Sequence, residues 1–94
     1  MEYCVYIMAN APRGTLYVGM TSNIVKRTFQ HKTKVIDGFT ARHGLTELVY
    51  FEVFSDVREA IKRERQIKKW NRIWKIELSE NSNPNWIDLY VNIH

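Results

Sequence analysis

Residues 57–76 read VREAIKRERQIKKWNRIWKI, which has the spacing of an amphipathic helix. Its apolar side chains recur at steps of three and four residues, and this stripe continues through position 64, which holds a glutamate. A carboxylate that faces a protein core is costly unless a cation compensates it. For Glu64 that cation is either a salt-bridge partner, Arg27 or Lys68, or a bound metal ion. The apolar stripe consists of Val57, Ala60, Ile61, Ile67 and Trp74.

The same segment is strongly basic. Residues 57–75 hold eight Lys or Arg against Glu59 and Glu64, whereas the net charge of the whole chain is +4. Cations that recur every three or four residues form one stripe along a helix. Such a stripe is either a solvated face or a surface for a phosphate backbone, and nucleic acid is the best functional interpretation. The basic stripe consists of Arg58, Lys62, Arg65, Lys69 and Arg72.

Length and composition limit the class of protein. The 94 residues, 45% of them apolar, suffice for one domain spanning residues 1–94 with one real core. No apolar run approaches the length of a membrane span, and the N-terminus lacks the pattern of a signal peptide. The single Cys4 excludes an internal disulfide and a cysteine zinc cluster. We therefore expect a cytoplasmic protein with no membrane association, monomeric by default.

The N-terminal third predicts a β-hairpin followed by a helix. Strands are expected at residues 2–8 and 16–20, since both are rich in β-forming residues, with a turn at 9–15 that contains Pro12 and Gly14. Thr21 or Ser22 can cap a helix that runs from about residue 23 to residue 32.

The remaining segments complete the predicted order of elements. A loop over residues 33–44 passes through Asp37, Gly38 and Gly44, and ELVYFEVF at 47–54 predicts a third strand. Asp56 caps the long helix, which Asn71 and Arg72 can interrupt before a short segment at 73–78. Asn83 and Pro84 are a stop signal, and the tail with Trp86, Leu89 and Tyr90 folds back on the core.

The predicted fold class is therefore α+β, an α/β sandwich. We expect a three-stranded, mainly antiparallel sheet flanked by helices, in the order β-β-α-β-α with a third short helix as an option.

The hairpin brings two tyrosines together in this prediction. If its centre lies between Ala11 and Pro12, Tyr6 faces Tyr17 directly across the strands, with Cβ atoms about 5 Å apart. A register shifted by one residue would separate them. Gly19 follows at the strand end, where a glycine indicates a close approach of backbone or ligand, or simply the end of the strand.

Two further candidates share one face of the next helix. Arg27 and His31 are four residues apart and so lie on one face of the helix. Ile24 lies near that face, which indicates that the face points partly toward the core. Arginine binds phosphate in a bidentate manner, and histidine can donate a hydrogen bond or move a proton near neutral pH. The alternative is a surface arginine beside a partly buried histidine.

Together these residues resemble the GIY-YIG nuclease domain. Val5-Tyr6-Ile7 stands near the first motif and Tyr17-Val18-Gly19 matches the second, followed by Arg27 ten residues after Tyr17 and His31 four residues later. Glu64, in the long amphipathic helix, matches the family's metal-binding glutamate. The chain is most similar to small single-domain bacterial proteins related to the catalytic domain of a bacterial excinuclease. The stretches that carry this resemblance are FT at 39–40, LVYFE at 48–52, REAIKRERQIKKWNR at 58–72 and NPNWIDL at 83–89.

The resemblance implies a divalent-metal-dependent DNA endonuclease, a hydrolase of phosphodiester bonds, structure-selective and linked to DNA repair or recombination; RNA is a second candidate substrate. Glu64 would hold one Mg²⁺ or Mn²⁺, because the sequence has no second acidic cluster near it and Mg²⁺ keeps several waters. Tyr6 or Tyr17 would activate or orient the attacking water, although a free phenol has a pKa of about 10 and needs help to act as a base. Arg27 would stabilise the scissile phosphate, and His31 would hydrogen-bond it or assist proton transfer.

Two departures from the family pattern keep other functions open. Met20 stands where many relatives carry a lysine, and Ile76 stands where some carry an asparagine, for which Asn71, Asn81 or Asn83 could substitute. The first alternative is therefore a nucleic-acid-binding module of the same fold with little or no catalysis. The second is an adaptor domain with an aromatic patch, whose binding would depend little on salt. That patch would consist of Trp70, Trp74, Trp86 and Tyr90.

Overall fold

The sheet has three strands, as predicted, and is antiparallel throughout. The computed structural model describes residues 2–35 and 38–93, so the expected loop residue Asp37 lies outside the described residues. The strands are β1 (Tyr3–Ala9), β2 (Leu16–Thr21) and β3 (Glu47–Phe54), in the spatial order β2-β1-β3. The α+β class and the predicted order of elements are confirmed.

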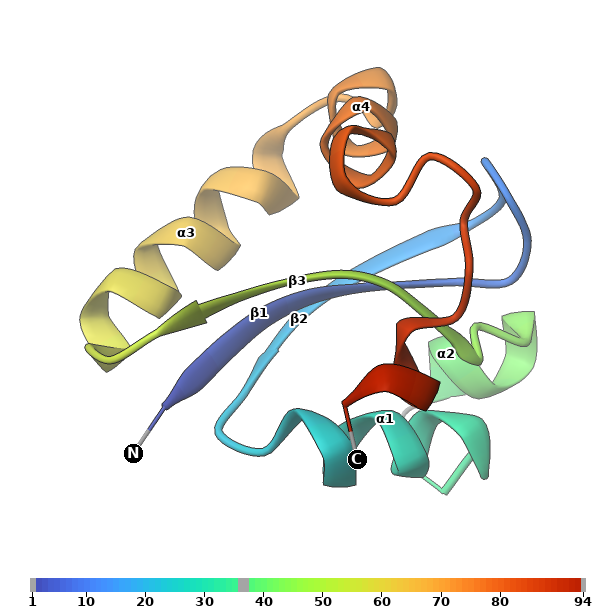
Figure 1. Ribbon diagram of the computed structural model, residues 1–94, viewed down its shortest axis with the longest axis horizontal. Coiled ribbons are helices and arrows are strands. Elements are labelled where there is room, and N and C mark those ends of the chain that lie inside the picture. Colours follow the sequence, from blue (N-terminus) through green and yellow to red (C-terminus); the bar gives the residue numbers. More distant parts are fainter. Residues whose placement is uncertain (1, 36–37, 94) are drawn as a thin grey trace.

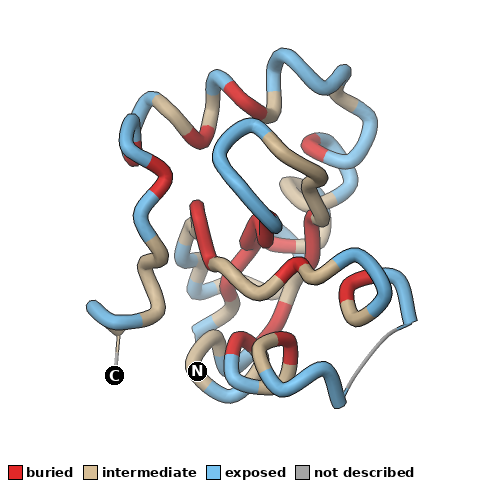
Figure 2. The backbone as a smooth tube through the Cα atoms, turned by 90° about the vertical axis from the view of Figure 1, so that its right-hand side faces the viewer, coloured by how far each residue is buried: buried red, intermediate tan, exposed pale blue. Residues whose placement is uncertain are grey.

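Helices cover both faces of this sheet (Figure 1). One face carries α1 (Ile24–Lys32), α2 (Gly38–His43) and a 3-10 helix near the C-terminus (Leu89–Asn92), and the other carries α3 (Val57–Lys69) and α4 (Arg72–Ser82). The central strand β1 is therefore buried on both sides along almost its whole length (Figure 2). Among the described residues, no helix has the length and apolar character needed to cross a membrane.

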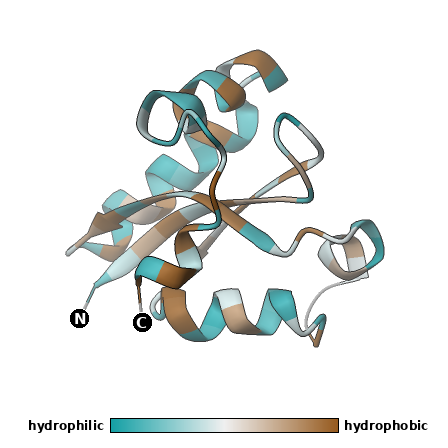
Figure 3. Ribbon diagram, turned by 45° about the vertical axis from the view of Figure 1, so that its right-hand side comes forward, coloured by the Kyte–Doolittle hydropathy of each residue, from teal (hydrophilic) through white to brown (hydrophobic). Residues whose placement is uncertain are grey.

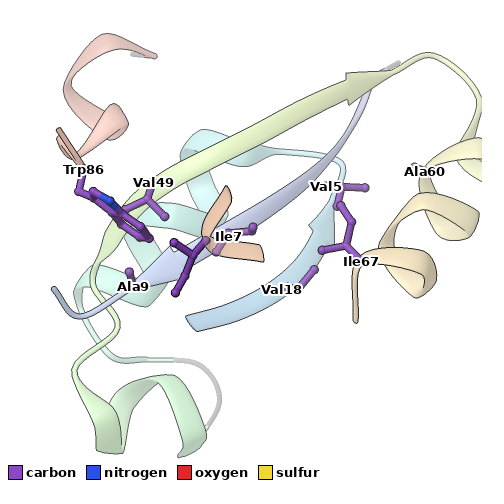
Figure 4. Close-up of a cluster of buried hydrophobic side chains, with 9 residues drawn as sticks. Val5, Ile7, Ala9, Val18, Val49, Ala60, Ile67 and Trp86 are labelled. Carbon is purple, nitrogen blue, oxygen red and sulfur yellow. The ribbon is translucent and has the colours of Figure 1, made fainter. Parts of the chain in front are cut away.

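The alternation of side chains along β1 divides the core in two. Val5, Ile7 and Ala9 point toward α3 and α4, where they join Ile67 and Trp86 in the larger cluster (Figure 4). Tyr6 and Met8 point the other way, and pack with Leu45 and Leu48. In Figure 3 much of the sheet has the brown of hydrophobic residues, whereas α3 is mostly the teal of hydrophilic ones.

Short polar side chains begin α1 and α3. The cap of α1 is Asn23, whose side chain accepts a hydrogen bond from the backbone N–H of Lys26, so the expected cap at Thr21 or Ser22 was wrong by one or two residues. The hydroxyl of Thr21 instead accepts from the N–H of Asn23 and fixes the approach to the helix. Asp56 caps α3 as predicted.

The long basic segment is two helices rather than one. The chain leaves the helical conformation at Trp70, whose ψ is 152°, and Asn71 caps α4 by accepting from the N–H of Trp74. This break changes the direction of the chain, so the apolar stripe of α3 does not continue into α4. The assignment of Trp74 to the buried stripe was wrong, because 53% of its surface is exposed.

The segment expected as a loop over residues 33–44 contains the helix α2, which the sequence did not predict. Its buried residue is Thr40, and a single inward residue gives no detectable helical periodicity. Beyond α4, Asn83 ends the helix as predicted, and its side-chain amide donates to the carbonyl groups of Val49 and Ile87. The tail does return to the core, where Trp86 is buried.

Candidate active site

The hairpin has a different register from the predicted one. Tyr6 pairs with Gly19, and Tyr17 pairs with Met8, so the two tyrosines are diagonal neighbours and the expected direct pairing was wrong. The turn is centred one residue further along the chain than expected: the N–H of Gly14 donates to the carbonyl of Ala11 at 2.9 Å. A displacement by two positions preserves the face of the sheet. The phenol rings therefore still meet, with centroids 6.4 Å apart.

Gly19 makes room for the ring of Tyr6. A Cβ atom at position 19 would lie 2.6 Å from the hydroxyl oxygen of Tyr6 and 2.7 Å from its Cζ. The close approach that the glycine indicated is thus made by a side chain of the neighbouring strand. Gly19 and Tyr6 form one packing unit, in which the absence of a side chain on β2 positions the phenol on β1.

The hydroxyl of Tyr6 belongs to a buried hydrogen-bonded chain. It lies 2.9 Å from Nε2 of His31, and Nδ1 of His31 lies 3.1 Å from Oγ1 of Thr40 on α2. The three residues are 0%, 1% and 1% exposed, respectively. Sequence reasoning missed Thr40; the signal that could have found it is that a buried histidine needs partners for both ring nitrogens.

Tyr17 occupies the outer side of this cluster. Its ring centroid lies 5.7 Å from that of His31 and 6.5 Å from that of Phe39 on α2. Unlike Tyr6, it is only partly buried. Of the two candidate phenols, Tyr17 is therefore the one that reaches the surface.

Arg27 lies one turn before His31 on α1 and is partly buried. One of its guanidinium nitrogens, Nη1, is 3.5 Å from the carbonyl oxygen of Met20 at the end of β2. The side chain lines a polar depression of about 320 Å³ together with Lys26. Two cations beside hydroxyl and amide groups suit an anion such as phosphate. The other residues that line this depression are Thr21, Ser22, Asn23 and Gln30.

Glu64 lies on α3, across the sheet from the tyrosines. Its carboxylate forms an ion pair with Lys68 at 3.0 Å, so of the two expected salt-bridge partners the structure has Lys68 and not Arg27. The side chain is 20% exposed, as is the paired carboxylate of Glu52. The structure thus brings Tyr6, Tyr17 and His31 together, with Arg27 on the same helix as His31, and leaves Glu64 on the opposite face.

Glu64 would offer a metal ion a single carboxylate, and this small number of protein ligands limits which ion could bind. Among residues 2–35 and 38–93 there is no group of three or more His, Cys, Asp or Glu side chains that could hold a metal ion. A zinc site needs three or four such ligands, whereas Mg²⁺ binds through one or two carboxylates and keeps waters or takes substrate oxygens. The donor set therefore fits Mg²⁺ or Mn²⁺ bound together with a phosphate.

Four of the five residues of the basic stripe are exposed along α3. Arg58, Lys62, Arg65 and Lys69 line a shallow depression of about 590 Å³ on the outer surface of the helix. The fifth residue, Arg72, belongs to α4, and its guanidinium donates to the carbonyl of Arg13. The expectation of one continuous five-residue stripe was thus wrong at Arg72, because the chain turns at Trp70.

Arg63 is a cation of α3 with a structural partner. It forms a bidentate ion pair with Glu52 of β3, and the hydroxyl of Tyr50 donates to the same carboxylate. Burial opposes the ionisation of Glu52, but the hydrogen bonds from Arg63 and Tyr50 outweigh it, so the pKa of Glu52 is lowered. The hydrogen bonds among Arg63, Glu52 and Tyr50 connect α3 to the sheet on the side of the helix away from the basic stripe.

The asparagines that could replace the family's missing one have different positions. Asn71 is occupied as the cap of α4, and Asn83 is buried with its amide bonded to backbone carbonyls. Asn81 is exposed on α4. Two of the three therefore have structural roles that explain them.

A family model described as the GIY-YIG catalytic domain matches residues 2–77, and the chain belongs to this family of nucleases. Within it, the chain is similar to the UPF0213 protein of Clostridium perfringens, with 42% identity over 78 residues that cover 83% of this chain and 82% of that protein. It is also similar to the UPF0213 protein of Syntrophus aciditrophicus, with 37% identity over 75 residues that cover 79% of this chain and 85% of that protein.

A solved structure has the same fold. The solution NMR structure of a UPF0213 protein from Bacillus halodurans matches with a TM-score of 0.58 and 25% identity, covering 94% of this chain and 93% of that one. The resemblance to small single-domain members of the GIY-YIG family is thereby confirmed.

Proposed function

We propose that the protein is a divalent-metal-dependent endonuclease that hydrolyses phosphodiester bonds in DNA with a single ion. The observation that best supports it is the packed cluster of Tyr6, His31 and Tyr17, with Arg27 one helical turn from His31. Phenol, imidazole and guanidinium groups in one place supply proton transfer and phosphate binding.

The two tyrosines have different tasks in this proposal. Tyr17 meets the attacking water, because it is the phenol at the surface. Tyr6 is enclosed and bonded to His31, so it orients its neighbours rather than contacting the substrate. Both ring nitrogens of His31 face protein groups, so we assign His31 to holding Tyr6 rather than to binding phosphate.

Arg27 would bind the phosphate from one face of the sheet, and Glu64 would hold the metal ion from the other. β2 is an edge strand and α3 packs against it, so a phosphate at this edge can be approached from both sides. Arg27 would bind its oxygens within the depression it shares with Lys26. Glu64 would hold the ion. When bound, such an ion polarises the phosphate and stabilises charge on the leaving oxygen.

The exposed cations of α3 supply affinity in this proposal. Arg58, Lys62, Arg65 and Lys69 would contact the phosphate backbone without reading sequence, so binding should weaken steeply as salt rises. Contacts of this kind recognise the shape of a substrate more than its sequence.

One observation favours the second candidate function, a nucleic-acid-binding module without catalysis. Glu64 is ion-paired with Lys68 on its own helix. If that pair persists in the presence of substrate, the carboxylate is structural and the basic helix still binds nucleic acid.

Cleavage of labelled single-stranded, duplex, flapped and branched DNA with Mg²⁺ or Mn²⁺ tests the proposal. We expect metal-dependent cleavage by the wild type, a loss of at least about 100-fold in Glu64→Gln, and no loss in Glu59→Gln, an exposed glutamate of the same helix. Circular dichroism would check that both variants fold. A folded Glu64→Gln protein with wild-type activity would refute the catalytic role of Glu64, and salt-sensitive binding without cleavage by any protein would favour the binding module.

A further inference from the structure

The bend between α3 and α4 forms a further pocket, away from the tyrosine cluster. It has a volume of about 450 Å³ and opens between the end of α3 and the outer side of α4. The indole rings of Trp70 and Trp74 form one wall, with centroids 6.0 Å apart and planes at 83°. The remaining lining residues are Glu77, Leu78 and Asn81.

The exposure of Trp74 is not explained by the packing of α4. This helix is anchored through Ile76 and Ser79, which are buried, whereas Trp74 is 53% exposed on the other side. The third tryptophan, Trp86, is only 5% exposed and donates its indole N–H to Glu80. Large exposed aromatic surface on a small protein is typical of a binding site.

The lining of the pocket has the chemistry of a nucleobase site. The indoles and Leu78 offer apolar surface against which a planar base can stack. The carboxylate of Glu77 can accept hydrogen bonds from the exocyclic amine of a base, and the amide of Asn81 can both donate and accept. A lipid or an aliphatic ligand would have no use for these two polar groups.

The charges around the pocket indicate that its ligand is attached to a phosphate backbone. Lys69 directly precedes Trp70 and is the last residue of the basic stripe on α3. The guanidinium of Arg63, which is ion-paired with Glu52, lies 5.2 Å from the ring centroid of Trp70. A strand whose phosphates follow α3 over the roughly 16 Å from Arg58 to Lys69 would deliver a base to Trp70.

We propose that Trp70 and Trp74 bind an unpaired nucleobase of a strand held by the basic stripe of α3. The base must be unpaired, because a base within a duplex is stacked on both faces and cannot enter a pocket. This inference rests on the proposed nucleic-acid partner and makes it more specific: the protein selects single-stranded, flapped or bulged substrates by capturing an unstacked base. It does not depend on cleavage.

Binding without divalent metal tests the pocket apart from the chemistry. Fluorescence anisotropy would be measured in EDTA with a labelled single strand, a duplex of the same length and a single strand made of abasic nucleotides. The wild-type chain would be compared with Trp74→Ala, with Trp74→Phe, which keeps an aromatic ring, and with Ile73→Ala. Ile73 is a matched control because it is the neighbouring residue, 59% exposed, and does not line the pocket.

We expect the wild type to bind the single strand about 10-fold more tightly than the abasic strand, which is the effect of stacking one base. Trp74→Ala should lose that preference while its affinity for duplex stays within about twofold, and Trp74→Phe and Ile73→Ala should keep it. Quenching of tryptophan fluorescence by the single strand but not by the abasic strand would support the same site. That measurement needs no variant, so it remains decisive if Trp74→Ala fails to fold.

Three results would overturn the inference. The first is equal affinity of the wild type for normal and abasic strands, and the second is a Trp74→Ala variant that still prefers the normal strand. The third is a dimer, detected by light scattering, that Trp74→Ala converts to a monomer. That result would make the pocket a contact between two copies of the chain. Failure of the proposed nuclease activity would be seen as absence of cleavage with Mg²⁺, and a base preference in EDTA would survive it.

Discussion

On the α1 side of the sheet a hydrogen-bonded group of polar side chains lies inside the protein, whereas on the α3 side a row of cations lies on its surface. Tyr6, His31 and Thr40 are buried and joined by hydrogen bonds. On α3, the apolar residues Ala60 and Ile67 face the sheet and the cations face solvent. The first arrangement depends on accurate packing, while the second depends on the charge of one helix face. The two faces should therefore respond differently to mutation.

The largest effect on stability should come from Gly19→Ala. The added methyl would lie within 3 Å of the Tyr6 ring, which cannot move away because it is fully buried and bonded to His31. We expect a loss of about 1–3 kcal/mol in the free energy of unfolding, measured with urea. Gly38→Ala is the control, since a Cβ there would meet only the flexible side chain of Arg42 at 3.1 Å. Equal stability of the two variants would mean that the Tyr6 ring is not confined.

A smaller effect is expected from Thr40→Val, which keeps the shape of the side chain and removes its hydroxyl. The variant removes the hydroxyl that lies beside Nδ1 of His31, at a cost of about 1–2 kcal/mol in the free energy of unfolding. Thr28→Val on α1 is the matched comparison, because among the described residues its buried hydroxyl has no hydrogen-bond partner. It should be neutral or stabilising. The ¹⁵N chemical shifts of the His31 ring nitrogens, measured at one pH, should change in Thr40→Val and not in Thr28→Val; the same response in both would contradict the assigned bond.

The smallest effect should come from a surface ion pair on the α3 and α4 side. Hydrogen bonds from Arg13 and from the indole of Trp86 lower the pKa of Glu80 to about 2, below its ordinary value of 4.5. Because the folded pKa is the lower one, the stabilisation is complete above about pH 4.5 and is lost as pH falls toward 2. Thermal unfolding from pH 7 to pH 2 should show wild type and Glu80→Gln converging as the pH falls. A difference that stays constant over this range would exclude the ion pair as its cause.

The α3 side of the sheet was more predictable from the sequence than the α1 side. The exposure of Arg58, Lys62, Arg65 and Lys69 follows from helical periodicity, and Asp56 is a strong local cap signal. The break after α3 lies beside Asn71 and Arg72, where the sequence allows an interruption of the helix. The expected positions of Trp74 and Arg72 were wrong, because they depend on the direction of α4, which tertiary contacts decide.

The α1 side of the sheet, which depends on packing, was predicted only in part. The position of Tyr6 and Tyr17 on the same side of the sheet follows from the two-residue period of strands, which tolerates a register error of two. The partner of His31 could not be predicted in the same way. Thr40 lies in a short helix whose position depends on contacts between segments distant in the sequence.

The turn between β1 and β2 has a consequence for the order of folding. Its tip is tied to a distant part of the chain, because the side chain of Arg13 pairs with Glu80 and its carbonyl accepts a hydrogen bond from Arg72. These contacts span 67 and 59 residues, and closing such long loops is slow compared with forming a hairpin. The hairpin tip should therefore acquire its native contacts late, after the transition state, so that Arg13→Ala speeds unfolding and leaves the folding rate almost unchanged.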